Sequence, residues 1–113
     1  MGLRAGFLMI FAIATFTSTV QAAPTSSPEG SITYMEGGWV GAGLRVQLSQ
    51  GPFTNPSACP LTDGYTTQPA DSGHQLFNAM LLSAYMSGRR VRVVVDGCAF
   101  DRPRIISVVI LPN

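Results

Sequence analysis

Three segments of the chain have strand patterns: the first mixes β-branched and aromatic residues, and in the other two apolar and polar side chains alternate, as in strands with one buried face. The segments are residues 31–36, 39–49 and 90–96, and the alternation is clearest at Leu44, Val46 and Leu48 and at Val91, Val93 and Val95. Residues 105–111 are apolar almost throughout and indicate a buried strand. A short strand is also expected over residues 64–67. Residues 50–60 carry several prolines and predict a loop.

Residues 73–87 predict the one helix, because they contain no proline and few β-branched residues. Asp71 or Ser72 is placed to cap its N-terminus, and Gly88 stands where a left-handed residue closes a helix. At about 100° per residue, one arc of the helix collects the side chains expected to pack on the sheet. These are Leu76, Phe77, Met80, Leu81 and Ala84.

The opposite face of the same helix is also apolar, with only Gln75 and Asn78 to make it polar. Its apolar members are Ala79, Leu82, Tyr85 and Met86. The surface helix of a monomer is usually polar there, so we predict that this face forms the interface of a homo-oligomer. The alternative is that the N-terminal leader or a loop of the same chain covers it.

The order of elements is two or three strands, the helix, then two strands. It predicts a mainly β fold with one helix (α+β). A small OB-like five-stranded barrel, with the helix between its third and fourth strands, fits this order, and so does a sheet packed on the helix. Residues 31–113 are expected to form this single domain, preceded by a disordered leader over residues 23–30 that is rich in Pro, Ser and Gly.

Residues 1–22 have the pattern of a secretory signal peptide. Arg4 precedes an apolar run over residues 7–14, and Val20-Gln21-Ala22 suits signal peptidase, so cleavage is predicted between Ala22 and Ala23. The run is shorter than the roughly 20 residues of a membrane-spanning helix. We therefore expect a secreted or periplasmic protein with no membrane span after cleavage.

Charge excludes some classes of partner. Only 12% of the residues are charged and the formal net charge is +1, which falls to zero once Arg4 is removed with the signal peptide. A strongly basic nucleic-acid binder and a disordered charged tail are therefore excluded. Five arginines gather near the last two strands, where they form either an outer sheet face balanced by Asp96 and Asp101 or a site for an anionic ligand such as a sialylated glycan or phosphate. They are Arg89, Arg90, Arg92, Arg102 and Arg104.

Two cysteines in an exported chain most simply form one disulfide, here Cys59–Cys98. Closing a loop of that length stabilises the fold by about 4 kcal/mol in the chain-entropy estimate. Metal binding is disfavoured because His74 is the one histidine and no CxxC spacing occurs. Neither a nucleophile motif nor a phosphate-binding glycine loop is present, so no enzyme, metal or cofactor is expected.

Residues 57–110 contain S-A-C-P-L, then L-F-N-A-M-L-L-S-A-Y-M-S-G-R-R-V-R-V-V-V-D-G-C, then a closing strand. The pattern A-Y-x-x-G-x-x-V-x-V at residues 84–93 resembles the B-subunit-like proteins of the subtilase cytotoxin type. The resemblance covers about half the chain, which lacks the extended C-terminal part of that family. It implies an OB-type fold, a pentamer, a glycan ligand and an exported enzymatic subunit as partner, and it aligns Ser31 with a serine that helps to hold the glycan.

These observations predict an exported, non-enzymatic binding protein that is a glycan-binding subunit of the toxin B type. The expected ligand is a carbohydrate held by an aromatic platform, with hydroxyl and guanidinium groups beside it. The candidate residues are Ser31, Tyr34, Trp39, Tyr65, Phe100, Arg90 and Arg92. The alternative is a periplasmic structural or inhibitor-like protein that binds a protein partner.

Overall fold

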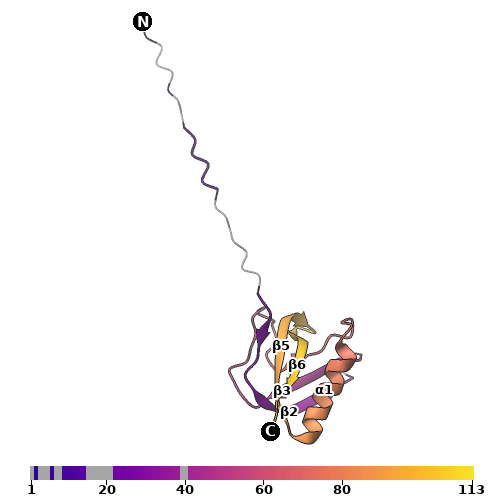
Figure 1. The fold of residues 1–113 in the computed structure, drawn as a ribbon. Coiled ribbons are helices and arrows are strands. Elements are labelled where there is room, and N and C mark those ends of the chain that lie inside the picture. Colours follow the sequence, from indigo (N-terminus) through magenta and orange to yellow (C-terminus); the bar gives the residue numbers. More distant parts are fainter. Residues whose placement is uncertain (1, 3–5, 7–8, 15–21, 39–40) are drawn as a thin grey trace.

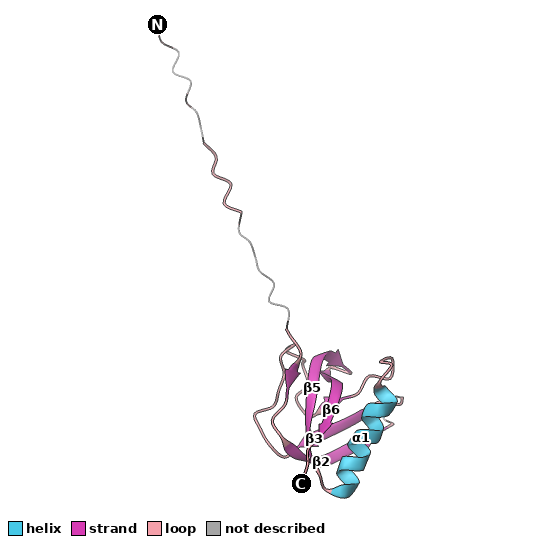
Figure 2. Cartoon of the chain, in the orientation of Figure 1, coloured by secondary structure: helices cyan, strands magenta, loops and turns pink. Residues whose placement is uncertain are grey.

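The computed structural model describes residues 2, 6, 9–14, 22–38 and 41–113 of the chain. The folded part begins at β1, and one helix packs against one side of the strands (Figures 1 and 2). The elements are β1 (Thr25–Ser26), β2 (Gly30–Gly37), β3 (Leu44–Leu48), β4 (Tyr65–Thr66), α1 (His74–Ser87), β5 (Arg90–Ala99) and β6 (Arg102–Ile110). No helix among the described residues has the length and apolar character needed to cross a membrane.

The strands form one six-stranded sheet that curls into a ring. β5 pairs antiparallel with β2 and with β6, β2 pairs antiparallel with β3, and β3 pairs antiparallel with β4. β4 and β6 run parallel and meet at a single pair, Thr66 and Arg104, so the ring is not evenly closed. β1 adds to β5 beside β2.

This arrangement confirms the predicted fold class, which is mainly β with one helix and one disulfide. If β1 and β2 are taken as one interrupted strand, five strands follow one another in the OB-like order, with α1 between the third and the fourth. The Cys59–Cys98 disulfide is also confirmed, with 5.8 Å between the two Cα atoms. It joins the loop that precedes β4 to the far part of β5.

The core lies between the inner faces of the strands and α1. Val91, Val93 and Val95 are fully buried, as their alternation predicts. In β6 the buried positions are Pro103 and Ile105, two residues apart, and Val108, which follows three residues later because the register to β5 shifts between Ile105 and Ser107. The strand predicted to be buried on both faces is therefore buried mainly on one.

The helix corrects one member of the predicted packing arc. Leu81 and Ala84 are buried and Phe77 and Met80 pack beside them, but Leu76 is 61% exposed. The buried arc centres on Leu81 and Ala84, which leaves Leu76 beyond its edge.

Both ends of the helix were assigned from the sequence, and only one assignment is right. Gly88 has φ +69° and closes α1 as predicted. At the other end, neither Asp71 nor Ser72 caps the helix with its side chain. Instead the backbone carbonyl of Asp71 accepts from His74 N at 3.1 Å, and the Asp71 carboxylate pairs with Arg104.

The leader predicted to be disordered takes part in the sheet. Thr25 and Ser26 pair with Val95 and Val94 of β5, and Ser27 is buried. Ser27 N donates to the carbonyl of Val93 at 2.8 Å, and Val93 N donates to the Ser27 hydroxyl at 3.0 Å. The serine hydroxyl thus supplies the acceptor that a backbone carbonyl of a neighbouring strand would otherwise provide. The Pro- and Ser-rich composition of the leader does not predict this contact.

Two strand boundaries also differ from the prediction. β3 begins at Leu44 rather than residue 39, since Gly41 (φ +84°) interrupts the extended backbone before it. β5 continues to Ala99 rather than ending at residue 96, and the Asp96-Gly97 pair forms an irregularity inside it, where Gly97 has φ +67° and the register to β6 shifts. The turn comes later, at Phe100 and Asp101.

Candidate functional site

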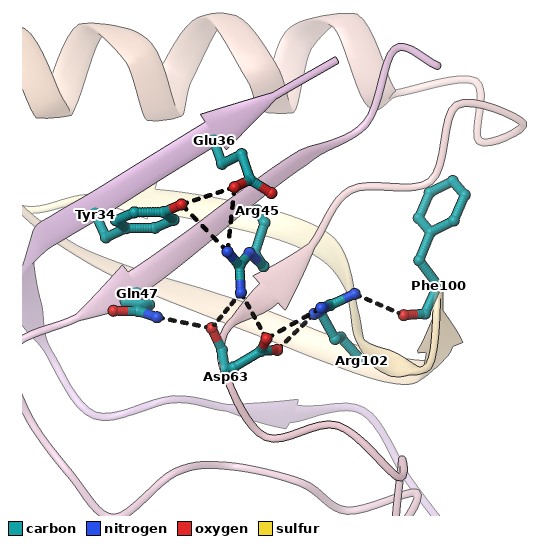
Figure 3. Close-up of polar contacts among 7 residues, drawn as sticks. All are labelled: Tyr34, Glu36, Arg45, Gln47, Asp63, Phe100 and Arg102. Atoms are coloured by element: carbon teal, nitrogen blue, oxygen red, sulfur yellow. Dashed lines mark hydrogen bonds and ion pairs between the residues drawn. The ribbon is translucent and has the colours of Figure 1, made fainter. Parts of the chain in front are cut away.

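A cluster of polar side chains covers the outer face of β2 and β3. Val46 is fully buried, so its neighbours Arg45 and Gln47 point outward. The antiparallel register sets Glu36 opposite Arg45 and Tyr34 opposite Gln47. Figure 3 shows Tyr34, Glu36 and Arg45 turned toward one another, whereas Gln47 points to Asp63.

Asp63 reaches this cluster because Gly64 lets the loop approach β3 closely. Gly64 has φ +146°, and a Cβ at this position would lie 2.8 Å from the carbonyl oxygen of Val46 and 2.9 Å from Cγ of Arg45. A residue with a side chain would therefore push the loop away from the strand. Glycine sets Asp63 beside Arg45.

The cluster is a network of ion pairs centred on Asp63. Arg45 Nη1 lies 2.6 Å from Asp63 Oδ2, and Arg102 Nη2 donates to the same oxygen at 3.0 Å. Arg102 Nε also pairs with Asp63 Oδ1, which completes a bidentate contact. On the other side, Arg45 Nη2 lies 3.3 Å from Glu36 Oε2, to which the Tyr34 hydroxyl donates at 2.7 Å (Figure 3).

These contacts shift the protonation equilibria of both acids in the same direction. The hydrogen bond from Tyr34, supported by the charge of Arg45, holds the pKa of Glu36 below its usual value. The hydrogen bond and charge of Arg102 lower the pKa of Asp63, and Asp63 in turn raises the pKa of Arg102. The carboxylates of Glu36 and Asp63 and the guanidinium of Arg102 therefore stay ionised at neutral pH.

Beside the network lies a groove of about 280 Å³, which we call the first groove. It is lined by Glu36, Gly43, Leu44, Arg45, Asp63, Thr66, Phe100 and Arg102. These residues come from β2, β3, β4, the first residue of β6, the β5–β6 turn and the loops that precede β3 and β4. In OB-type folds the second and third strands and the adjoining loops form the usual ligand-binding face, and the first groove lies on that face.

Phe100 occupies an unusual backbone position at the wall of the first groove. It has φ +51° and Asp101 has φ +66°, so both central residues of the β5–β6 turn are left-handed. Such turns favour Asn and Gly, and a bulky side chain there is strained. The ring lies close to Gly43, where a Cβ would come within 3.1 Å of it.

Two polar groups in the lining have no partner among the described residues. They are the hydroxyl of Thr66, which is only 4% exposed, and Nε of Arg45. Buried polar groups in proteins are nearly always hydrogen-bonded. Both atoms are shielded from solvent, so neither is open to a ligand in the first groove.

The structure brings some of the predicted ligand residues to this region and not others. Tyr34 is 38% exposed and joins the network, and Phe100 lines the first groove. Tyr65 is 2% exposed and stacks on Phe53 with 4.7 Å between ring centroids, so it serves the core. Ser31 pairs with Arg90 across β2 and β5 and does not line the first groove.

The remaining predicted ligand residues are placed elsewhere. Arg90 and Arg92 lie near Glu29, at 3.4 Å and 3.6 Å between charged atoms. The five arginines therefore do not form one site, because Arg102 and Arg104 pair with Asp63 and Asp71. Trp39 lies outside the described residues.

The predicted interface residues lie on the outer face of α1. Leu82, Tyr85 and Met86 are exposed, and so is Ala79. Leu76 joins them, which widens the exposed apolar face beyond the prediction.

Among the members of the network, the sequence pointed to Tyr34 and Arg102 but not to Glu36 and Asp63, and it assigned Arg45 no role in a site. The outward position of Arg45 and Gln47 was visible in the alternation of β3. A short strand was expected over residues 64–67, but nothing in the sequence shows that Asp63, just before it, lies against β3. Within the described part of the chain, no group of three or more His, Cys, Asp and Glu side chains is arranged to hold a metal ion.

In comparisons with known proteins, the chain matches no protein family model, no curated protein and no solved structure. The resemblance to subtilase cytotoxin B subunits therefore stays a hypothesis. The function has to be argued from the fold and the first groove.

Proposed function

We propose that this protein is an exported, non-enzymatic binding protein that holds a carbohydrate in the first groove. One observation carries the proposal: the first groove sets the ring of Phe100 beside a fixed array of ionised side chains on the ligand-binding face of an OB-like fold. Strained backbone conformations cluster at ligand sites, and Phe100 has one.

Carbohydrate suits this groove because a sugar ring combines an apolar C–H face with a rim of hydroxyl groups. The C–H face packs on an aromatic ring such as Phe100. The hydroxyl groups both donate and accept, so they match carboxylates and guanidinium groups held close together.

Nucleic acid suits it less well. Glu36 and Asp63 stand among the lining residues, and their negative charges repel phosphate groups. Each arginine of the first groove already pairs with one of these acids.

Export is supported by the signal-like N-terminal segment and by the disulfide, since disulfides persist in oxidising compartments. The resemblance adds a finer proposal, in which the protein is the B subunit of a toxin, assembles as a homopentamer and accompanies an exported enzymatic subunit. The exposed apolar face of α1 supports self-association.

A glycan array probed with the oxidised protein tests carbohydrate binding. Phe100→Ala removes the ring from the first groove and should weaken binding about tenfold or more, which equals about 1.4 kcal/mol. Leu61→Ala is the matched control, because Leu61 is exposed nearby but lines neither this groove nor the network. An array on which the wild-type protein binds no carbohydrate contradicts the proposal.

The apolar face of α1 also supports a second candidate, a periplasmic structural or inhibitor-like protein that binds a protein partner. Two results together would favour this candidate. The array shows no carbohydrate binding, and the protein captures one defined exported protein in an interaction that Leu82→Glu abolishes. A gene for an exported enzyme beside this one would favour the toxin subunit instead.

A further inference from the structure

A second groove of about 250 Å³ lies next to the first. Its lining includes Gln47, Leu48, Ser49, Phe53, Thr62 and Tyr65. The half-buried ring of Phe53, stacked on the buried ring of Tyr65, gives it one aromatic contact, and the amide and hydroxyl groups of Gln47, Ser49 and Thr62 give it polar contacts. It therefore combines the same two kinds of surface as the first groove.

The two grooves share Asp63 and follow one another along β3. Leu44 and Arg45 line the first, while Gln47 and Leu48 line the second. The carboxylate of Asp63 bonds to Arg45 and Arg102 on the side of the first groove. Its backbone carbonyl accepts from Nε2 of Gln47 at 2.9 Å on the side of the second. Outward residues two apart on a strand are about 7 Å apart, so one extended molecule can contact both grooves.

The segment between the grooves is held at several points. The Cys59–Cys98 disulfide fixes its start to β5, and Leu61 N donates to the carbonyl of Asp101 at 2.9 Å. Asp63 is held by the ion pairs described above. These contacts keep the spacing of the two grooves constant. A ligand therefore binds with little loss of conformational entropy in this segment.

The charges lining both grooves balance. Arg45 and Arg102 pair with Glu36 and Asp63 in the first groove, and Asp63 is the one charged residue among those that line the second. An acidic sugar or a sulfate would meet two arginines that are already paired and two carboxylates that repel it. An uncharged sugar avoids this cost.

We propose that the two grooves are adjoining subsites for one linear, uncharged oligosaccharide, with Asp63 contacting the sugar units on both sides. This inference rests on the proposed carbohydrate binding and adds the length and the charge of the ligand. A ligand confined to the first groove would leave the second without a role.

The test uses an array on which each neutral chain is printed as mono-, di-, tri- and tetrasaccharide, with and without a terminal sialic acid or sulfate. The full oxidised protein should bind the tri- and tetrasaccharide of a neutral series about tenfold more tightly than its monosaccharide. Adding sialic acid or sulfate should not strengthen binding.

A blocking variant separates the two subsites. Thr62→Trp fills the second groove from an exposed position and leaves the ion pairs of Asp63 in place. It should remove the preference for longer chains and keep the binding of the monosaccharide. Leu61→Trp adds the same bulk one residue away, outside both grooves, and should keep the preference.

Three outcomes would overturn the inference alone: binding independent of chain length, an unchanged length preference in Thr62→Trp, or tighter binding of the sialylated or sulfated chains. Absence of all carbohydrate binding by the wild-type protein would overturn both this inference and the proposed function. A thermal melt of each variant shows that it is folded before its array is read.

Discussion

At the scale of single residues, Phe100 and Asp101 are not the residues that would stabilise their turn most. Both have positive φ in a two-residue turn between paired strands, since Ala99 faces Arg102 across it. Asn-Gly is the usual sequence of such a turn, because these two residues tolerate left-handed backbone. A phenylalanine there stabilises the turn less and places a ring at the first groove.

Replacing the pair Phe100-Asp101 by Asn-Gly should therefore raise the free energy of unfolding by about 1–2 kcal/mol, as the backbone strain is relieved. The same change removes the ring and should abolish carbohydrate binding. Urea unfolding and glycan binding measure the two effects. Phe100→Ala is the matched control, because it loses the ring but keeps a side chain at positive φ, and it should lose binding without a gain in stability. A stable variant that still binds would show that the ring has no part in recognition.

The ion pairs at the same site predict a dependence of stability on pH. The pKa values of Glu36 and Asp63 are lowered by folding, so both carboxyls bind protons more readily in the unfolded chain. Their contribution is present above about pH 4, the usual range of the unfolded groups, and is lost as the pH falls through the lower values of the folded state. Asp63→Asn should flatten the fall of the unfolding free energy between about pH 5 and pH 2. The check is urea unfolding across this range, and an equally steep fall in the variant would contradict the assignment.

At the scale of elements, the alternation of side chains was enough to predict the strands and the helix, because burial of one face leaves a period in the sequence. Their ends were less predictable. β1 escaped detection because a serine hydroxyl and two backbone pairs hold it, and neither leaves an apolar pattern. The network around Asp63 also escaped, since its members come from β2, β3, a loop and β6, and only the folded chain brings them together.

The network depends on Gly64, because this glycine lets the loop that carries Asp63 pack closely against β3. Gly64→Ala would bring a Cβ to 2.8 Å from the backbone of β3 at φ +146°, a region essentially reserved for glycine. We expect it to destabilise the fold by about 3 kcal/mol. Gly88→Ala is the control, with φ +69° but no atom within 4 Å, and should cost only about 1 kcal/mol. Thermal melts compare the two variants, and equal losses would show that the close approach to β3 is not tight.

At the scale of the whole molecule, the grooves and the apolar helix face are separate surfaces on one small ring of strands. The groove-lining residues come from β2, β3, β4, β6 and the loops beside them, whereas the exposed apolar side chains are on α1. α1 packs against β2, β5 and β6 with its other face. A ligand in the grooves and a second copy on the helix therefore need not compete.

The exposed face of α1 predicts that the protein is a homo-oligomer. Leu76, Leu82 and Met86 are 61%, 51% and 77% exposed, and α1 carries no acidic residue in its first turn and no basic residue in its last turn. The leader, which was the alternative cover, pairs instead with β5 through Thr25 and Ser26. Three large apolar side chains exposed together on a small domain favour burial against a neighbour, where each stabilises the assembly by about 1.5–3 kcal/mol if fully buried.

Leu82→Glu places a charge at the centre of that face, away from the core and the grooves. It should convert the oligomer into a folded monomer, because burying an unpaired carboxylate costs more than the contact returns. Sedimentation velocity at tens of micromolar measures the change, and circular dichroism shows that the fold is kept. Ser26→Glu adds the same charge at an exposed position of β1 and should leave the oligomer intact. A wild-type protein that sediments as a monomer at this concentration would exclude the interface, and an oligomer that survives Leu82→Glu would place it on another surface.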